Sequence, residues 1–218
     1  GKDDIVWLIE NGKLRPSKQL ADSLSSMLKN NREFVLLDEQ LVVYETALAM
    51  ARKAQSGQKQ VLVVEGGPGT GKSVVAVNLL VNLNAEGLSA IYVTKNAAPR
   101  DVYSVKLSNE YKKTYINNLF VGSGNFIDTP EDSIPALVVD EAHRLNEKSG
   151  LFNNLGDNQV REIIRAAKFS VFFVDDRQRI HIKDIGSKRS IVQIATECGA
   201  EVHVDQLSSQ FRCNGSDG

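Results

Sequence analysis

Cysteine is scarce in this sequence, and a secretory signal is not recognisable in it. Two cysteines in 218 residues are too few for a disulfide framework. The N-terminal stretch GKDDIVWLIENGK lacks the apolar segment and the small-residue cleavage site of a signal peptide. These absences favour a reducing, cytoplasmic setting.

Long apolar runs are also missing. The longest lie at residues 136–139 and 169–174, and the second contains a serine. A membrane-spanning helix needs about 20 predominantly apolar residues. We therefore expect no transmembrane helix and no membrane partner.

Neither sign of charge dominates, because 26 basic and 27 acidic residues give a net charge of −1. Such a balance provides no overall attraction to nucleic acid, although a local cluster of charge could. Apolar residues make up 42% of the chain and charged residues 24%, which is usual for a globular protein and excludes a disordered tail or a collagen-like fibre. The length suits one α/β domain.

Strand patterns alternate with helical patterns from residue 61 onward. The run VLVVE at 61–65 is short, β-branched and apolar, as is typical of a strand buried on both faces. The alternation predicts an α/β fold, a mainly parallel sheet with helices on both faces. We expect strands at 61–65, 90–94, 119–122, 136–140, 170–175 and 201–205, and helices at 16–30, 39–55 (with Asp38 as N-cap), 72–84, 103–115, 158–168 and 188–198.

The segment GGPGTGKS fits the phosphate-loop pattern G-x-x-x-x-G-K-[ST], with a strand before it and a helix after it. Its glycines let successive N–H groups point at a phosphate, and the helix N-terminus adds partial positive charge there. The alternative is a glycine-rich turn that merely opens a helix. The nucleotide-binding residues that we predict are Gly67, Pro68, Gly69, Thr70, Gly71, Lys72 and Ser73, with Lys72 on the β- and γ-phosphates and Ser73 on Mg²⁺.

Two adjacent carboxylates, Asp140 and Glu141, follow the apolar run 136–139. Mg²⁺ in such sites keeps several waters and needs a carboxylate to hold one, and hydrolysis needs a second group to orient the attacking water. We expect Asp140 to hold a water of the Mg²⁺ ion and Glu141 to orient the attacking water. An isolated acidic pair at this position would instead suggest a helix N-cap.

Polar residues also follow the strand expected at 170–175. Because parallel strands end at the same edge of a sheet, Gln178 is expected to approach the nucleotide and to sense the γ-phosphate. Asp175 and Asp176 are interpreted as a capped turn. His143 is either a hydrogen-bonded structural imidazole or a relay between the γ-phosphate site and a neighbouring loop.

A last polar segment, LSSQFRC, follows the strand at 201–205. Its Arg212 could supply planar, bidentate charge to the γ-phosphate as an arginine finger within the same chain. Taken alone, Arg212 would more often be a surface ion-pair residue.

The order of these segments resembles the first RecA-like domain of superfamily 1 helicases. More closely, GGPGTGKS, IYVTKNAAPR, LVVDEAHR, VFFVDDRQRI and LSSQFRCNGSDG are similar to the bacterial family called the Schlafen group 3-like DNA/RNA helicase domain. The resemblance covers roughly residues 35–218. It implies a three-layer P-loop NTPase fold of the RecA-like type, with ATP and Mg²⁺ as cofactors.

The resemblance implies further site residues. Gln40 matches the helicase glutamine that reads adenine, although a glutamine near the start of a surface helix usually has no such role. Thr94, Lys95 and Asn96 would occupy a strand-end loop that contacts a nucleic-acid backbone.

Two stretches carry a local excess of positive charge. Residues 95–113 hold five basic and two acidic side chains with two interleaved tyrosines, and residues 176–189 hold the same balance of charge. In such segments, basic side chains can contact the phosphates of a nucleic acid, and tyrosines can stack on its bases. A solvated surface is the alternative for both.

These observations predict an ATP- and Mg²⁺-dependent motor core acting on DNA or RNA. Residues 1–34 are expected to be an extension with one short helix, and 35–218 the first RecA-like domain of a longer protein. The resemblance implies a second RecA-like domain outside this piece, so we expect the piece to hydrolyse ATP slowly and to unwind nothing alone. The alternative is a nucleotide-dependent regulatory switch without nucleic-acid activity; a small-molecule kinase fits the motifs less well.

Overall fold

A computed structural model of the chain describes residues 22, 25–26, 28–30, 32–95, 118–149, 155–178 and 185–208. The predicted helix at 103–115 lies outside them. In the described part of the chain, no helix is both long and apolar enough to span a membrane.

The centre of the fold is a six-stranded sheet in the order β3-β2-β4-β5-β1-β6, with every neighbouring pair parallel. This confirms the predicted α/β class. The strands are β1 (Gln60–Gly66), β2 (Ala90–Val93), β3 (Phe120–Val121), β4 (Ile134–Val139), β5 (Ala167–Val174) and β6 (Glu201–Leu207).

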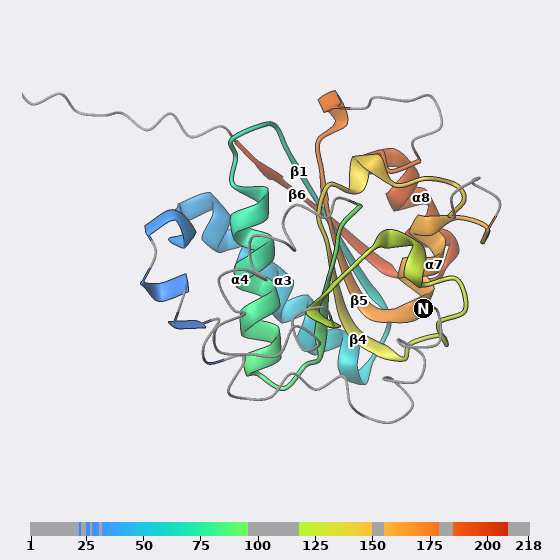
Figure 1. The fold of residues 1–218 in the computed structure, drawn as a ribbon, viewed down its shortest axis with the longest axis horizontal. Coiled ribbons are helices and arrows are strands. Elements are labelled where there is room, and N and C mark those ends of the chain that lie inside the picture. Colours follow the sequence, from blue (N-terminus) through green and yellow to red (C-terminus); the bar gives the residue numbers. More distant parts are fainter. Residues whose placement is uncertain are drawn as a thin grey trace, which may run out of the picture.

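Helices cover both faces of the sheet and give the predicted three layers (Figure 1). On one face lie α3 (Asp38–Ser56) and α4 (Lys72–Ala85), and on the other lie α7 (Gln159–Ala166) and α8 (Lys188–Glu197). Short 3₁₀ turns occur at η1 (Arg32–Phe34), η2 (Ser123–Asn125), η3 (Ala142–Arg144) and η4 (Asp176–Gln178).

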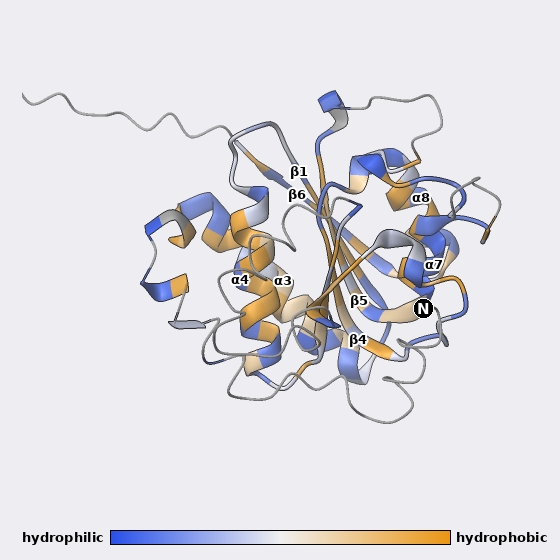
Figure 2. Cartoon of the chain, viewed as in Figure 1, coloured by the Kyte–Doolittle hydropathy of each residue, from blue (hydrophilic) through white to orange (hydrophobic). Residues whose placement is uncertain are grey.

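The strand β1 separates two hydrophobic cores, as its sequence predicts. Leu62 and Val64 pack into the core under α3 and α4, while Val61 and Val63 pack into the core under α7 and α8. Alternate side chains of a strand point to opposite faces, so an uninterrupted apolar run suits a strand that is covered twice. Figure 2 shows the central strands and much of α4 as hydrophobic.

Most element boundaries differ from the prediction by a few residues, and two of these differences have a clear physical reason. The helix expected to reach residue 168 ends at Ala166, and β5 begins at Ala167 without a loop, because 167–174 pairs with β1 and β4. The helix α3 begins at Asp38 with Leu37 as its N-cap. The side chain of Gln40 accepts a hydrogen bond from the Leu37 N–H, so Asp38 is not needed as a cap.

Candidate nucleotide-binding site

Most of the predicted site residues that the structure describes lie at the carboxyl edge of the sheet, where ligands bind in open α/β folds. The strand order places β5 between β4 and β1. As a result the phosphate loop after β1, the acidic pair after β4 and the segment 175–178 after β5 lie on three neighbouring strands.

The phosphate loop runs from the end of β1 to the first turn of α4. Two of its glycines, Gly69 and Gly71, have φ angles of 73° and 83°, in the left-handed region that favours glycine. The Thr70 hydroxyl donates to the Gly67 carbonyl at 2.8 Å and closes the loop. The helix α4 then starts at Lys72, so its first N–H groups face this loop.

Lys72 folds back on the loop in this structure. Its Nζ donates to the carbonyls of Gly66 at 2.6 Å and of Gly67 at 2.8 Å. Burial lowers the pKa of the Lys72 ammonium, and the carboxylates of Asp175, Asp140 and Glu141 oppose that shift. A phosphate beside Lys72 would replace part of the solvation that burial removes.

Asp140 and Ser73 form the contact between the two main motifs. The Ser73 hydroxyl donates to Oδ2 of Asp140 at 2.8 Å, and the N–H of Glu141 donates to Oδ1 at 2.8 Å. The hydroxyl of Tyr92 donates to the same Oδ2 at 2.5 Å. The buried Asp140 carboxylate is therefore held from three directions.

These oxygens fit the predicted Mg²⁺. A Ser73 hydroxyl that donates a hydrogen bond to Asp140 keeps its oxygen lone pairs for a cation, and Mg²⁺ prefers oxygen ligands. Among the residues that the structure describes, no three His, Cys, Asp or Glu side chains form a metal site of their own. A nucleotide-bound Mg²⁺ does not require one, because phosphates and waters supply most of its ligands.

Glu141 has an unusual backbone. Its φ of 50° and ψ of 41° lie in the left-handed region, which a residue with a side chain seldom adopts. Such conformations cost about 1–3 kcal/mol and concentrate at functional sites. The half-buried Glu141 carboxylate lies 3.8 Å from the guanidinium of Arg144.

His143 connects the acidic turn to the end of β5. Its Nδ1 accepts a hydrogen bond from the Asp175 N–H at 3.2 Å, and its Nε2 is buried without a hydrogen-bond partner. Burial, with a smaller effect of Arg144, lowers the pKa of His143, so the imidazole is neutral near pH 7. Because Nδ1 accepts, the proton of the neutral ring is on Nε2.

Asp175 belongs to this site, which the sequence interpretation missed. The capped turn that we expected is present, because Oδ1 of Asp175 accepts from the Arg177 N–H at 3.1 Å. Its Oδ2, however, is buried without a hydrogen-bond partner, and its charge favours the ammonium form of Lys72. A carboxylate that directly ends a buried central strand was the available signal.

The other predicted residues are placed as follows. Gln178 is the last residue of η4, lies at the same edge of the sheet and is half-buried. Its backbone N–H donates a hydrogen bond to the Asp175 carbonyl at 3.0 Å. Thr94 is buried at the end of β2, and its N–H donates to the Val121 carbonyl at 3.1 Å. Arg212 and Asn96 lie outside the described residues.

Gln40 lies directly against the phosphate loop. Its Nε2 donates to the Thr70 carbonyl at 3.0 Å, and its Oε1 accepts from the Leu37 N–H at 3.0 Å. A Cβ at Gly71 would lie 2.1 Å from that Nε2, so a side chain there would displace the Gln40 amide, and the positive φ of Gly71 independently favours glycine. The start of α3 is thus tied to the loop.

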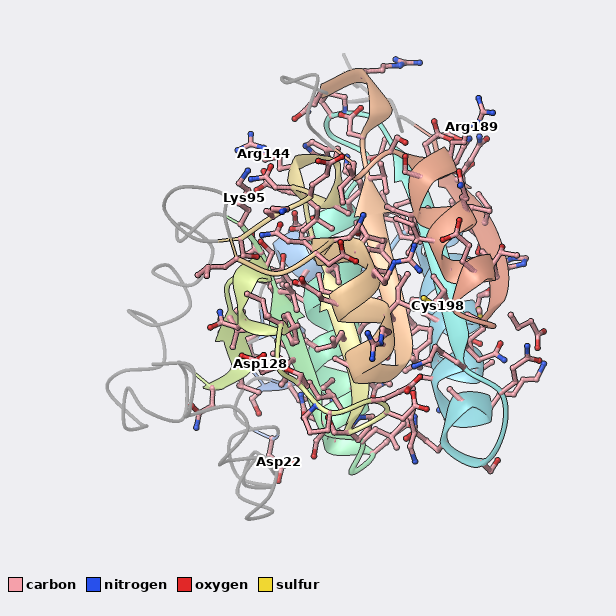
Figure 3. All side chains as sticks on the ribbon, turned by 90° about the vertical axis from the view of Figure 1, so that its right-hand side faces the viewer. Asp22, Lys95, Asp128, Arg144, Arg189 and Cys198 are labelled. Atoms are coloured by element: carbon pink, nitrogen blue, oxygen red, sulfur yellow. The ribbon has the colours of Figure 1, made fainter. Side chains whose placement is uncertain are left out.

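Lys95 borders the segment that follows the acidic pair. Its Nζ donates to the Arg144 carbonyl at 3.0 Å and to Oδ1 of Asn146 at 3.0 Å, and Figure 3 shows Lys95 and Arg144 side by side. In the second basic stretch, Lys188 pairs with Glu65 at the end of β1. Lys188 thereby lowers the pKa of Glu65, and part of the positive charge of that stretch is neutralised.

A glycine-rich loop between the first strand and a helix, with an acidic pair at the end of a parallel strand that one further strand separates from the first, defines the P-loop NTPase class of fold. The sequence matches the family model described as Schlafen group 3, DNA/RNA helicase domain, over residues 59–218. The chain belongs to this family. Gln40 lies outside the matched range.

Several solved structures are similar in fold. They include a DNA replication initiation factor (15% identity, TM-score 0.44, covering 83% of this chain and 48% of that chain). AMPPCP-bound DnaA from Aquifex aeolicus is similar at 16% identity and a TM-score of 0.44, covering 83% of this chain and 49% of that chain. The Sulfolobus solfataricus SWI2/SNF2 ATPase core in complex with dsDNA is similar at 11% identity and a TM-score of 0.42, covering 78% of this chain and 45% of that chain. This chain thus spans about half of each protein. No curated protein matches the sequence.

Proposed function

We propose that this chain is the ATP- and Mg²⁺-dependent NTPase core of a motor that acts on DNA or RNA. The observation that carries the proposal is the hydrogen bond from Ser73 to Asp140, which joins the phosphate loop to the acidic pair across 67 positions of the chain. Membership in a DNA/RNA helicase domain family supports the motor part.

The phosphate loop would bind the nucleotide. Its N–H groups and the N-terminus of α4 offer donors to the phosphates. Lys72 would exchange the carbonyls of Gly66 and Gly67 for the β- and γ-phosphates, which are charged acceptors and therefore stronger. Mg²⁺, held by Ser73 and through water by Asp140, would neutralise phosphate charge.

Glu141 would orient the attacking water and accept its proton. Gln178 and Arg212 would contact the γ-phosphate, and these contacts would exist only in the triphosphate state. Hydrolysis would then change which arrangement of the protein is favoured, which is how a motor converts chemistry into movement. His143 would pass the change from the acidic turn to β5, because its Nδ1 is bonded to the Asp175 N–H.

The nucleic acid would bind beside Thr94, Lys95 and Asn96. The contacts of Lys95 with Arg144 and Asn146 support a coupling between that loop and the acidic turn. In the domain organisation that we propose, residues 1–34 are an extension, 35–218 are the first RecA-like domain, and a second RecA-like domain completes the motor. Packing of Leu28 into the core under α3 and α4 supports an extension that lies on this domain.

ATP turnover of the protein tests the enzymatic part. Lys72→Ala removes the positive charge that would contact the phosphates, and Glu141→Gln removes the group that would accept the proton of the water. Each is expected to lower turnover by at least about 100-fold. Lys53→Ala and Glu86→Gln are matched controls, because both side chains form exposed ion pairs outside the site. Unchanged turnover in either site variant, with the controls active, would contradict the proposal.

Binding of single-stranded DNA or RNA tests the motor part. We expect affinity that falls steeply with salt, and a loss of at least several-fold in Lys95→Ala but not in Lys53→Ala. Turnover without any nucleic-acid binding at low salt would favour the alternative, a nucleotide-dependent switch that acts on a protein partner.

A further inference from the structure

Tyr92 is a fully buried tyrosine whose hydroxyl donates a hydrogen bond to the carboxylate of Asp140. The side chain is 1% exposed, and its ring packs against Phe120 with the ring centres 5.4 Å apart and the planes tilted by 49°. A buried tyrosine requires a partner for its hydroxyl, and here one partner is Oδ2 of Asp140 at 2.5 Å.

The strand register explains why Tyr92 reaches this carboxylate. Tyr92 of β2 pairs with Val138 of β4, and both side chains lie in the core under α3 and α4. Alternate residues of a strand share a face, so Asp140, two residues after Val138, is directed to the same side. The long tyrosine side chain therefore reaches from the position opposite Val138 to the carboxylate of Asp140, just after the end of β4.

The three bonds on Asp140 restrict what its carboxylate can still accept. A carboxylate offers about four lone-pair positions. Tyr92 and Ser73 donate to Oδ2, and the N–H of Glu141 donates to Oδ1, so about one position remains. Together with Ser73 and the Glu141 N–H, the Tyr92 hydroxyl restricts rotation of the carboxylate about its Cβ–Cγ bond.

We propose that Tyr92 is a positioning residue for the Mg²⁺ site, and this inference rests on the proposed function. By holding Oδ2, it directs the remaining lone pair of Asp140 toward a metal-bound water and keeps Ser73 beside it. Residues that orient metal ligands in this way typically contribute about 10–100-fold to metal affinity or activity. Phenylalanine would fill the same core volume without supplying this donor.

The variant Tyr92→Phe tests the inference, with Tyr44→Phe as its matched control. Tyr44 is a half-buried tyrosine whose hydroxyl accepts a hydrogen bond from the Asn82 side chain in the outer helix layer. Binding of a fluorescent ATP analogue is measured by anisotropy, first in EDTA and then across a Mg²⁺ titration. Ser73→Ala serves as the positive control for loss of a metal ligand.

In Tyr92→Phe we expect the Mg²⁺ concentration at half-saturation to rise by about 10-fold or more. Affinity in EDTA should be unchanged, and saturating Mg²⁺ should restore the wild-type affinity. Tyr44→Phe should behave as wild type throughout. The unchanged EDTA affinity also shows that the variant is folded.

Two results would overturn the inference while leaving the proposed function intact. One is the same Mg²⁺ dependence in Tyr92→Phe and in the wild-type protein. The other is an equal loss of affinity with and without Mg²⁺, which would indicate a structural role only. A wild-type protein whose nucleotide affinity does not depend on Mg²⁺ would overturn the proposed function, and the inference with it.

Discussion

The side chain of Gln40 donates a hydrogen bond to the carbonyl of Thr70 at 3.0 Å, which links the start of α3 to the phosphate loop 30 residues later in the chain. The Oε1 of the same side-chain amide accepts a hydrogen bond from the N–H of Leu37. Removing the side chain would leave two backbone groups without these partners. The loop that we propose for phosphate binding therefore depends on a residue outside its own sequence motif.

We predict that Gln40→Ala lowers the free energy of unfolding by about 1–3 kcal/mol, because the Thr70 carbonyl loses its partner in a buried bond. Affinities for ATP, GTP and inorganic triphosphate should fall together, since the loop itself is less well held. Isothermal titration of the three ligands measures this. Gln55→Ala is the control, because Gln55 also donates to backbone carbonyls but at the far end of α3. A loss confined to ATP would support the adenine-reading role instead.

A second prediction concerns Gly186, which lies against the acidic turn. A Cβ at this position would lie 1.6 Å from the Ala142 carbonyl oxygen and 3.0 Å from the His143 Cα. Both are backbone atoms, so the turn or the start of α8 must move. We expect Gly186→Ala to cost at least about 1–3 kcal/mol of stability in urea unfolding, and to lower ATP turnover.

Gly57→Ala is the matched control for that substitution. Its Cβ would make an ordinary contact of 3.4 Å with the Lys53 carbonyl, and its φ of −147° is open to alanine. We expect a change within about 1 kcal/mol, in the stabilising direction if anything. Equal stability of the two variants would contradict the close contact between Gly186 and the turn.

A third prediction follows from the pKa of His143, which burial lowers from its usual 6.5. The folded state binds the proton less readily than the unfolded state. The contribution of His143 to stability is therefore complete above about pH 6.5 and is lost as the pH falls from there through the lower folded pKa. The groups that act on it are Arg144 and Lys72, which lower its pKa, and Asp175 and Asp140, which raise it.

Urea unfolding at pH 7.5, 6.5 and 5.5 measures this effect. His143→Asn retains an acceptor for the Asp175 N–H but does not titrate in this range, so its stability should fall less between pH 7.5 and 5.5. Parallel pH profiles for the two proteins would show that His143 does not contribute.

A fourth prediction concerns the opposite edge of the sheet. Lys59 is nearly buried, and its Nζ donates to the carbonyls of Ile164 at 2.8 Å and Ala167 at 2.7 Å and pairs with Asp132. It thereby holds the junction of α7 and β5. We expect Lys59→Met to lower stability by about 1–3 kcal/mol with no change in nucleotide affinity.

Lys53→Met provides the comparison, because its ion pair with Glu201 is exposed. Exposed ion pairs contribute about 0–1 kcal/mol. A loss of stability in Lys59→Met no larger than that in Lys53→Met would contradict a structural role for the buried ammonium.

Local patterns in the sequence were sufficient to predict several parts of the fold. The helix expected at 72–84 is observed as Lys72–Ala85, and the strand expected at 136–140 as Ile134–Val139. These elements could be predicted because apolar runs, glycines and helix formers act over a few neighbouring residues. The helix prediction was wrong at residues 167–168, where the local pattern is helical. Pairing of this segment with β1 and β4 outweighs that local pattern, so the residues form a strand.

The sequence by itself determined the α/β class, the phosphate loop and the position of the acidic pair at a strand end. Only the tertiary structure decided which side chains join them. Asp175 enters the site because β5 lies between β4 and β1, and Tyr92 reaches Asp140 because β2 pairs with β4. Strand order and register bring together residues far apart in the chain, and such contacts depend on the packing of the whole sheet rather than on any local pattern.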